Sequence, residues 1–458
     1  MLVFGPMALF AQPARAERDW LSTEDYITPG EFPQTGDESQ CDRDLINHPL
    51  HLADVVQLAL CNNPQTRSLW ASARTQAATI GVNMSAYLPS LSVSGSGSRN
   101  LSSLGGGQTT GTSSRSVSLT VSYLLYDFGK RSANLENAKQ LLVAANASRD
   151  ATLQTNFLTA VQSYYSLLSA HANVKSLEVA EDAARQSFEA AEARYQAGTA
   201  TPSDKLQAKT ALAQATLNLI TAQGTERTAR GTLANVMGFD ASQPYQLAPA
   251  RLADPDPKRE QDIRKLIDRA LATRPDLVAA NAQIKAAEAQ LDASRAANMP
   301  SITLNASSGS TNVTGAPTSN SSSVSVSVSF PLFTGLRNTY QIRSSQAQLE
   351  SKVAARDLLA NQVALDVWKA FQNLRTNAQA LRSANALLAS AELSEKMTLG
   401  RYKAGVTNMS IVDVLNAQSS LASARQQLVA ARYNFQSSRM ALVQAIGVLD
   451  LTQIGNKE

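Results

Sequence analysis

Four segments of the chain show a strict alternation of apolar and polar residues. From Val117 to Tyr123 every second residue is apolar, and the residues between them are Ser or Thr. A period of two is typical of a β-strand that presents two different faces. The sequence therefore predicts two pairs of strands, each pair joined by a polar loop near 100–114 or 311–321, at about residues 88–99, 115–127, 300–310 and 322–333.

A long helical segment follows each strand pair, at about residues 130–197 and 336–403. Neither segment contains proline, and their apolar residues recur with helical spacing. At 1.5 Å per residue, each helix would be about 100 Å long. A glycine-containing turn then leads into a shorter helix, at about 204–237 and 411–446. Abundant alanine with spaced leucines favours tightly packed coiled coils, whereas a soluble helical rod would leave the strand pairs unexplained.

The two halves of the chain share motifs in the same order. YLPSL at 87–91 and NMPSI at 298–302 lie 211 residues apart, and RYQAG at 194–198 and RYKAG at 401–405 lie 207 residues apart. An offset of this size is too long for a solenoid repeat, so each half must contain a complete set of elements. The sequence predicts an internal tandem duplication.

Composition excludes several classes of protein. The chain has 458 residues with a formal net charge of +4, three His and two Cys. Charge spread this thinly offers no dense basic face, which disfavours a nucleic-acid partner. Three His leave few side chains for acid–base or metal chemistry. We expect a non-enzymatic protein with no cofactor, no metal site and no catalytic residue.

The N-terminus has two features of an export signal. Residues 2–10 are apolar, and Ala14-Arg15-Ala16 gives the small-x-small pattern of a cleavage site. We predict a signal peptide at 1–16, with a truncated start because the basic region is missing; a frayed apolar terminus is the alternative. No later segment has 18 apolar residues in a row, so a membrane location would require strands.

Export also bears on the two cysteines. Cys41 and Cys61 are close in sequence, and an oxidising periplasm favours their pairing in a structural disulfide. His48 and His51 lie between them, so a Cys/His metal site is the alternative, although the spacing matches no zinc pattern.

The strands have the length and alternation of transmembrane β-strands. Four strands cannot close a barrel, whereas three copies of the chain would supply twelve. Six aromatic residues lie where strands meet helices and would form an interfacial girdle: Tyr87, Tyr123, Tyr126, Phe128, Phe330 and Phe333. We predict an α+β membrane protein with long α-helical hairpins in a periplasmic α-barrel and four transmembrane strands per protomer, which form a 12-stranded β-barrel as a trimer. A soluble sheet with ordinary core aromatics is the alternative.

The combined motifs resemble the TolC family of outer-membrane efflux proteins. They are the duplicated strand starts, YDFGKR at 126–131, the RYxAG pair, RPDL at 274–277, LANVMGF at 233–239 and LVQAIGVL at 442–449. The resemblance covers about residues 50–450. It implies a trimeric channel-tunnel in the outer membrane that docks with a periplasmic adaptor protein and with an inner-membrane pump or ABC transporter.

Three residues near the hairpin turns are candidates for a periplasmic gate. Asp204 and Asp413 follow the two turns at matching places, where a ring of carboxylates would favour cations; the alternative role for each is a helix N-cap. In the resembled family a Tyr–Asp link closes the entrance, which implies Tyr402 and Asp204 here, and Asp413 belongs to an electronegative ring. The longer second turn, the lack of Arg between Gly405 and Asp413, and Asn416 at a second ring position depart from the family pattern.

The predicted function is an exit duct for tripartite efflux or type I secretion. The unlipidated N-terminus and the segment around Cys61 favour type I secretion of large RTX toxins, multidrug efflux is the alternative, and a trimeric coiled-coil surface adhesin is the alternative from another class. The predicted domains are a signal peptide (1–16), an N-terminal periplasmic segment (17–51), a first repeat (52–250), an equatorial linker (251–262), a second repeat (263–450) and a C-terminal tail (451–458).

Overall fold

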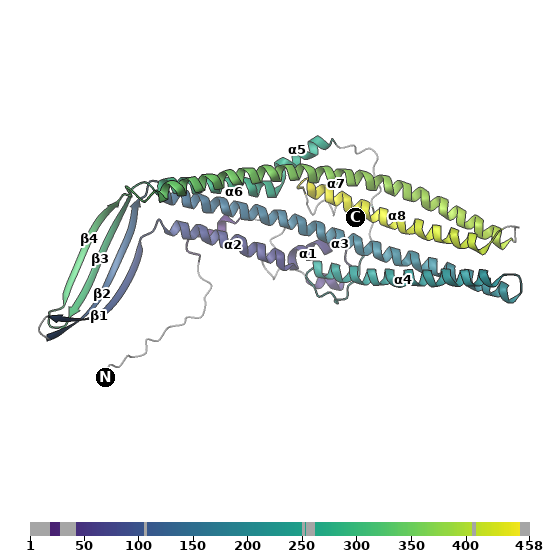
Figure 1. Ribbon diagram of the computed structural model, residues 1–458, viewed down its shortest axis with the longest axis horizontal. Coiled ribbons are helices and arrows are strands. Elements are labelled where there is room, and N and C mark those ends of the chain that lie inside the picture. Colours follow the sequence, from purple (N-terminus) through teal and green to yellow (C-terminus); the bar gives the residue numbers. More distant parts are fainter. Residues whose placement is uncertain are drawn as a thin grey trace. The chain divides into compact units, whose positions relative to one another are not determined.

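The computed structural model describes residues 19–27, 43–104, 108–249, 252, 262–404 and 409–448 (Figure 1). Short 3-10 helices lie at Thr23–Tyr26 and Arg43–Asn47. The α-helices are α1 (Leu52–Asn62), α2 (Pro64–Ser85), α3 (Lys130–Gln196), α4 (Pro202–Val236), α5 (Ile263–Thr273), α6 (Pro275–Ala296), α7 (Arg337–Lys403) and α8 (Ile411–Ala445). The strands are β1 (Ser90–Leu104), β2 (Gln108–Tyr126), β3 (Ser301–Val313) and β4 (Ser319–Ser329).

The two halves of the chain repeat one order of elements. Helices α1 and α5 have 11 residues each, α2 and α6 have 22, α3 and α7 have 67, and α4 and α8 have 35. Pro64 and Pro275 explain the break between the first two helices of each half, because the residue before a proline disfavours helical geometry. Asn63 and Arg274 are accordingly extended, with ψ of 123° and 126°.

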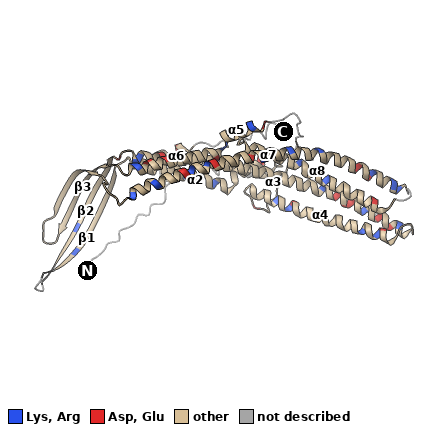
Figure 2. Cartoon of the chain, turned by 45° about the horizontal axis from the view of Figure 1, so that its top comes forward, with Lys and Arg blue, Asp and Glu red and all other residues tan. Residues whose placement is uncertain are grey.

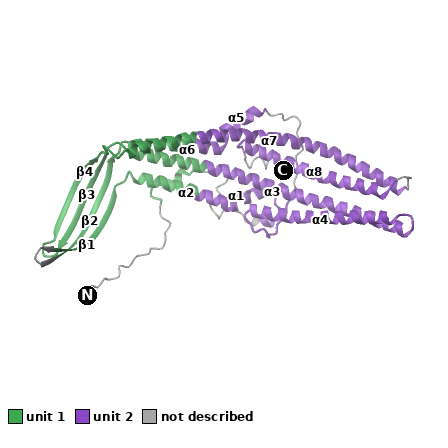
Figure 3. Cartoon of the chain, viewed as in Figure 1, with its two compact units in different colours: residues 1–28, 72–146, 282–353 green, residues 29–71, 147–281, 354–458 purple. Residues whose placement is uncertain are grey.

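The chain divides into two compact units (Figure 3). Unit 1 takes in residues 1–28, 72–146 and 282–353, and it contains all four strands. Unit 2 takes in residues 29–71, 147–281 and 354–458, and it contains α4, α5 and α8 with parts of the longer helices. No helix among the described residues is both long enough and apolar enough to cross a membrane.

The sheet of unit 1 is antiparallel, with the order β1-β2-β3-β4. Its register pairs Leu91 with Val121, Val121 with Ala306, and Leu304 with Val326, so one face of the sheet carries the apolar residues. The other face carries Ser and Thr, and serine hydroxyls on neighbouring strands form hydrogen bonds with one another. The Oγ–Oγ distances are 2.7 Å for Ser94–Ser118, 2.8 Å for Ser96–Ser116, 2.8 Å for Ser98–Ser114 and 2.9 Å for Ser307–Ser323.

At their loop ends the strands reach further than the alternation of apolar residues indicated, whereas β4 ends at Ser329, before its predicted end at 333. The prediction of a polar loop at 100–114 was wrong for most of its length, because β1 extends to Leu104 and β2 begins at Gln108. Both strands of this pair remain hydrogen-bonded through that region, from Ser98 opposite Ser114 to Leu104 opposite Gln108. In the second half β3 extends to Val313, and β4 ends at Ser329, which leaves Phe330 and Phe333 outside the strand.

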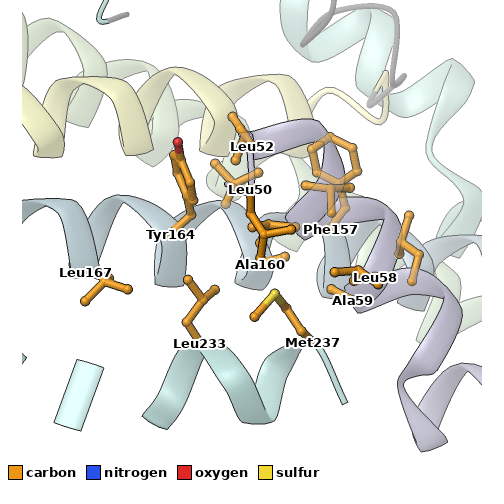
Figure 4. Close-up of a cluster of buried hydrophobic side chains, with 14 of the residues drawn as sticks. Leu50, Leu52, Leu58, Ala59, Phe157, Ala160, Tyr164, Leu167, Leu233 and Met237 are labelled. Atoms are coloured by element: carbon orange, nitrogen blue, oxygen red, sulfur yellow. The ribbon is translucent and has the colours of Figure 1, made fainter. Parts of the chain in front are cut away.

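Unit 2 has a buried core where α1, α3 and α4 meet. Phe157, Tyr164 and Met237 are at most 1% exposed, and Figure 4 shows them with leucines from α1 and α4. A short parallel bridge between Leu50 and Leu247 closes this core, with Leu50 N donating to Gln246 O at 2.9 Å.

A glycine in the left-handed region lies two residues after the end of α4 and of α8. Gly238 has φ of 81° and Gly447 has φ of 78°. A Cβ at Gly238 would lie 2.8 Å from Asn62, and a Cβ at Gly447 would lie 2.9 Å from the side chain of Arg274. The positive φ and the close contact each disfavour a side chain at these positions. This explains why the LANVMGF and LVQAIGVL motifs both contain a glycine there.

Candidate functional site

The candidate gate residues lie at the hairpin ends of unit 2. Helix α3 ends at Gln196, Gly198 turns the chain with φ of 70°, and Thr201 caps α4. The carboxylate of Asp204 accepts hydrogen bonds from Thr201 N (3.0 Å) and from Thr201 Oγ1 (2.9 Å). Asp204 N donates in return to Thr201 Oγ1 at 3.2 Å. This reciprocal pair is a capping box, which satisfies two backbone donors at the start of α4.

Asp413 occupies the same position at the start of α8. Its Oδ2 accepts hydrogen bonds from Ser410 N (2.9 Å) and from Ser410 Oγ (3.0 Å). The backbone N–H of Ser410, followed by its hydroxyl, lowers the pKa of the Asp413 carboxyl below its ordinary value, because both donors favour the charged form. The matching places of Asp204 and Asp413 therefore have a structural reason, since each carboxylate completes an N-terminal cap.

The cap at Asp413 leads to a pH-dependent prediction. A depressed pKa in the folded state stabilises the fold above the unfolded value of 3.8, and this contribution is lost as the pH falls through the lower folded pKa. Asp413→Asn should lower the thermal unfolding midpoint at pH 7, and the difference from wild type should vanish at the acid end of a series from pH 7 to pH 2. Asp268→Asn is the control, because this exposed carboxylate on α5 makes no hydrogen bond with a described residue. A midpoint difference that persists unchanged at the lowest pH would remove the charge from this explanation.

The structure pairs Tyr402 with Arg194. The guanidinium carbon of Arg194, near the end of α3, lies 4.3 Å from the centre of the Tyr402 ring, a cation–π contact. Tyr402 also packs at the edge of a cluster that joins all four hairpin helices, with Ala191, Ala208, Ile411 and Val414 at its centre. Tyr402 and Asp204 thus lie at the ends of two different hairpins, which the cluster joins. Their described polar contacts are with Arg194 and Thr201, so the direct link between them stays a prediction.

Arg194 was not among the residues that the sequence singled out. The repeated Arg-Tyr pair, at 194–195 and at 401–402, was the available signal. The contact itself joins the Arg of the first pair to the Tyr of the second, across more than 200 residues, and depends on how α3 and α7 pack.

An ion pair crosses the first hairpin. Lys205 Nζ on α4 lies 2.8 Å from Glu192 Oε2 on α3, and it also lies 5.1 Å from the centre of the Tyr195 ring. The hydrogen bond from Lys205 is the main cause that lowers the pKa of the partly exposed Glu192 carboxyl. This pair ties the end of α3 to the start of α4.

The six aromatic residues of the predicted girdle all belong to unit 1. Tyr87 lies between α2 and β1, and Tyr123 and Tyr126 lie in the last four residues of β2. The other three, Phe128, Phe330 and Phe333, lie between a strand and the following helix. Five of them are 38–80% exposed, and the exception, Tyr123, is partly buried. Tyr126 and Phe128 stack edge to face at 4.7 Å. Their clustering at the strand–helix junctions is seen in the structure, whereas a role as a membrane girdle stays a prediction.

Arg131 organises the first of these junctions. Its Nη1 donates to the carbonyls of Leu124 (2.8 Å) and Ala86 (3.2 Å), and its Nε lies 3.2 Å from the carboxylate of Asp127. The guanidinium also lies 4.7 Å from the centre of the Tyr87 ring. Arg131 therefore fixes the end of β2 next to the segment that enters β1.

Only one cysteine of the predicted disulfide lies in the described part of the chain. Cys61 lies at the end of α1, whereas Cys41 falls outside the described residues, so their disulfide stays a prediction. The described part of the chain contains no group of three or more His, Cys, Asp or Glu side chains that could hold a metal ion.

Comparison with known proteins identifies relatives over most of the chain. The family described as "Outer membrane efflux protein" matches residues 55–239 and again residues 266–448. Protein CyaE of Bordetella pertussis is 31% identical over 409 residues, which cover 88% of this chain and 85% of CyaE. The alkaline protease secretion protein AprF of Pseudomonas aeruginosa is 24% identical over 422 residues, which cover 88% and 85% of the two chains.

The fold has solved counterparts as well. The outer membrane protein VceC of Vibrio cholerae superposes with a TM-score of 0.73 at 21% identity, over 86% of this chain and 96% of VceC. At this level of identity the likeness establishes the fold alone.

Proposed function

Because the chain belongs to the outer membrane efflux protein family, we propose that it forms a trimeric channel-tunnel, a passive exit duct through the outer membrane. In this proposal the four strands of three copies close a 12-stranded β-barrel. The helices of unit 2 form an α-barrel in the periplasm. The aromatic residues at the strand–helix junctions, Tyr87 and Phe333 among them, lie at the membrane interface on the helical side.

The observation that carries the proposal is the sheet, with its two unlike faces and its two open edges. Within the described residues β1 pairs only with β2, and β4 pairs only with β3. Unpaired backbone groups are costly in lipid, so both edges must find partners there. Two copies would give eight strands, whose interior side chains fill. Three copies are therefore the smallest closed ring that leaves an aqueous lumen lined by the Ser and Thr face.

A passive duct needs partner proteins that supply the energy for export. We propose that the helical end docks with a periplasmic adaptor protein, which connects it to an inner-membrane pump or ABC transporter. The family description, which names efflux, supports such a system. The name of AprF, an alkaline protease secretion protein whose length this chain matches over 85%, supports a secretion system as well.

For the cargo we favour protein secretion of the type I kind over drug efflux. The name of AprF supports secretion, and the family description, which names efflux, keeps multidrug efflux as the second candidate from the sequence. Deletion of the gene in its host separates the two. Loss of a large protein from the culture medium supports secretion, whereas greater sensitivity to several unrelated drugs with an unchanged set of secreted proteins supports efflux.

The proposed gate is tested by single-channel recording in planar bilayers. We propose that Tyr402 and Asp204 hold the resting entrance shut and that Asp413 selects for cations, with adaptor docking separating the hairpins. Tyr402→Phe combined with Asp204→Ala should raise the conductance, because it removes both the phenol hydroxyl and the carboxylate. Asp413→Ala should reduce the preference for cations, because a ring of three carboxylates loses its charge.

A control separates the gate from the helix cap. Thr201→Ala disrupts the capping box but leaves the Asp204 carboxylate in place, so the conductance should stay at the wild-type value. If Thr201→Ala opens the channel as much as the Tyr402 and Asp204 variant does, the capping box explains the effect and the Tyr–Asp link is not needed.

A further inference from the structure

Two arginines interrupt the apolar face of the sheet. Arg99 lies on the same face of β1 as Leu91 and Val93. Arg115 lies on the same face of β2 as Val117 and Leu119, so both arginines lie on the apolar face. Arg115 lies opposite Gly97, and Arg99 lies opposite Ser113. The two arginines therefore belong to adjacent cross-strand pairs on that face and are diagonal neighbours. The Cβ atoms of such diagonal neighbours are no more than about 7 to 8 Å apart, so two long arginine side chains from these positions can turn toward one ligand.

The surroundings leave both guanidinium groups open. Both residues are exposed, and neither forms an ion pair or a hydrogen bond with a described residue. The described residues of the four strands contain no Asp or Glu, and Figure 2 shows basic residues in β1 and β2 without acidic neighbours there. Gly97, opposite Arg115, leaves space beside that side chain. The guanidinium of Arg99 extends toward Gly111, on the side away from Arg115, so a shared ligand requires the Arg99 side chain to change rotamer.

The position of the pair along the strands identifies the kind of ligand. Arg115 is eight residues from Tyr123, about 27 Å of strand, and the pairing of Arg99 with Ser113 places it ten residues from Tyr123. A tilted strand needs about 9–11 residues to cross a bilayer. If the junction aromatics mark one membrane interface, the arginine pair therefore lies at the other interface, at the end of the apolar band.

We infer that Arg99 and Arg115 form a binding site for the phosphate groups of a lipid headgroup in the outer leaflet, such as the phosphorylated lipid A part of lipopolysaccharide. This inference rests on the proposed barrel. Guanidinium groups bind phosphate oxygens in bidentate fashion, and the fork geometry makes arginine better suited to this than lysine. At the rim of the apolar face the acyl chains would contact Val117 and Leu119 while the phosphates contact the two guanidinium groups. Three copies of the chain would carry three such sites.

Native mass spectrometry of the detergent-extracted protein tests the site. Purified lipid A is titrated into wild type and into the double variant Arg99→Gln, Arg115→Gln, and the fraction of lipid-bound protein is measured. Wild type should retain lipid A, and the double variant should bind it at least about tenfold more weakly, as the loss of charged hydrogen bonds implies. Monophosphoryl lipid A should bind wild type more weakly than lipid A, and inorganic phosphate in equal excess should not displace the lipid.

Matched variants make the outcome specific. Arg382→Gln with Lys396→Gln removes two exposed charges from α7 and should leave lipid A binding unchanged. Arg99→Lys with Arg115→Lys keeps the charge but not the fork, so its affinity should also fall, and this variant serves if the glutamine variant does not insert. Wild-type binding by the glutamine variant, failure of wild type to bind lipid A, or displacement by inorganic phosphate would each overturn the inference.

A parallel measurement separates this inference from the proposed function. Planar-bilayer conductance of the same wild-type preparation reports whether the chain forms a channel at all. A conducting protein without lipid A binding overturns the lipid site alone, whereas a protein that gives no conductance in any preparation contradicts the duct itself.

Discussion

Leu119→Arg is expected to prevent most of the protein from assembling in the outer membrane. Leu119 lies on the apolar face of β2, opposite Val93 and Ser308, four residues from Tyr123 and four from Arg115. An arginine on the lipid face near the midplane of a barrel costs about 2 to 4 kcal/mol, and the trimer would carry this cost three times. The measurement is the amount of heat-modifiable trimer recovered from outer-membrane fractions.

The neighbouring residue provides the control. Thr120 lies on the opposite face of the same strand, opposite Ser92 and Ser307. Thr120→Arg should assemble in normal amounts, because its side chain would extend into an aqueous lumen, and it should lower the preference for cations. If both variants assemble equally well, the apolar face does not contact lipid.

Phe157→Ala is expected to produce the largest loss of stability within unit 2. The Phe157 ring on α3 is fully buried in the core that α1, α3 and α4 share. Replacing a buried phenylalanine by alanine removes apolar contacts and leaves a cavity, at a cost of about 3 to 5 kcal/mol. The measurement is the midpoint of urea unfolding, followed by far-UV circular dichroism of the detergent-solubilised protein.

A conservative variant separates cavity formation from other effects. Phe157→Leu keeps most of the apolar volume, so its cost should be below about 1.5 kcal/mol. A Phe157→Ala midpoint that matches the Phe157→Leu midpoint would show that the site collapses without a cavity and that this core is less tightly packed than its burial indicates.

Local sequence signals predicted the helices better than the ends of the strands. The long helices predicted at about 130–197 and 336–403 match α3 and α7, because uninterrupted helical spacing without proline is a local signal. The strands were harder, because residues 108–116 contain Gly, Ser and Thr where an apolar alternation would have marked a strand. These residues pair with β1 through the backbone ladder, and hydroxyl contacts such as Ser98 with Ser114 accompany it; both join residues that no local pattern relates.

The candidate gate shows the same division between local and distant contacts. The capping boxes at Asp204 and Asp413 involve residues three positions apart, so the N-cap role could be foreseen from sequence. The contact of Arg194 with Tyr402 joins helices from the two halves of the chain and could not. The register that places Arg99 and Arg115 on one face likewise required the strand pairing.

The most direct test of the proposed duct is the number of chains in the detergent-extracted protein. Native mass spectrometry measures it without relying on the shape of the particle. Because β1 and β4 each have one open edge and three sheets close a ring with an aqueous lumen, the account predicts a single species of three times the mature chain mass. A monomer that retains its sheet, or an assembly with a copy number other than three, would contradict it.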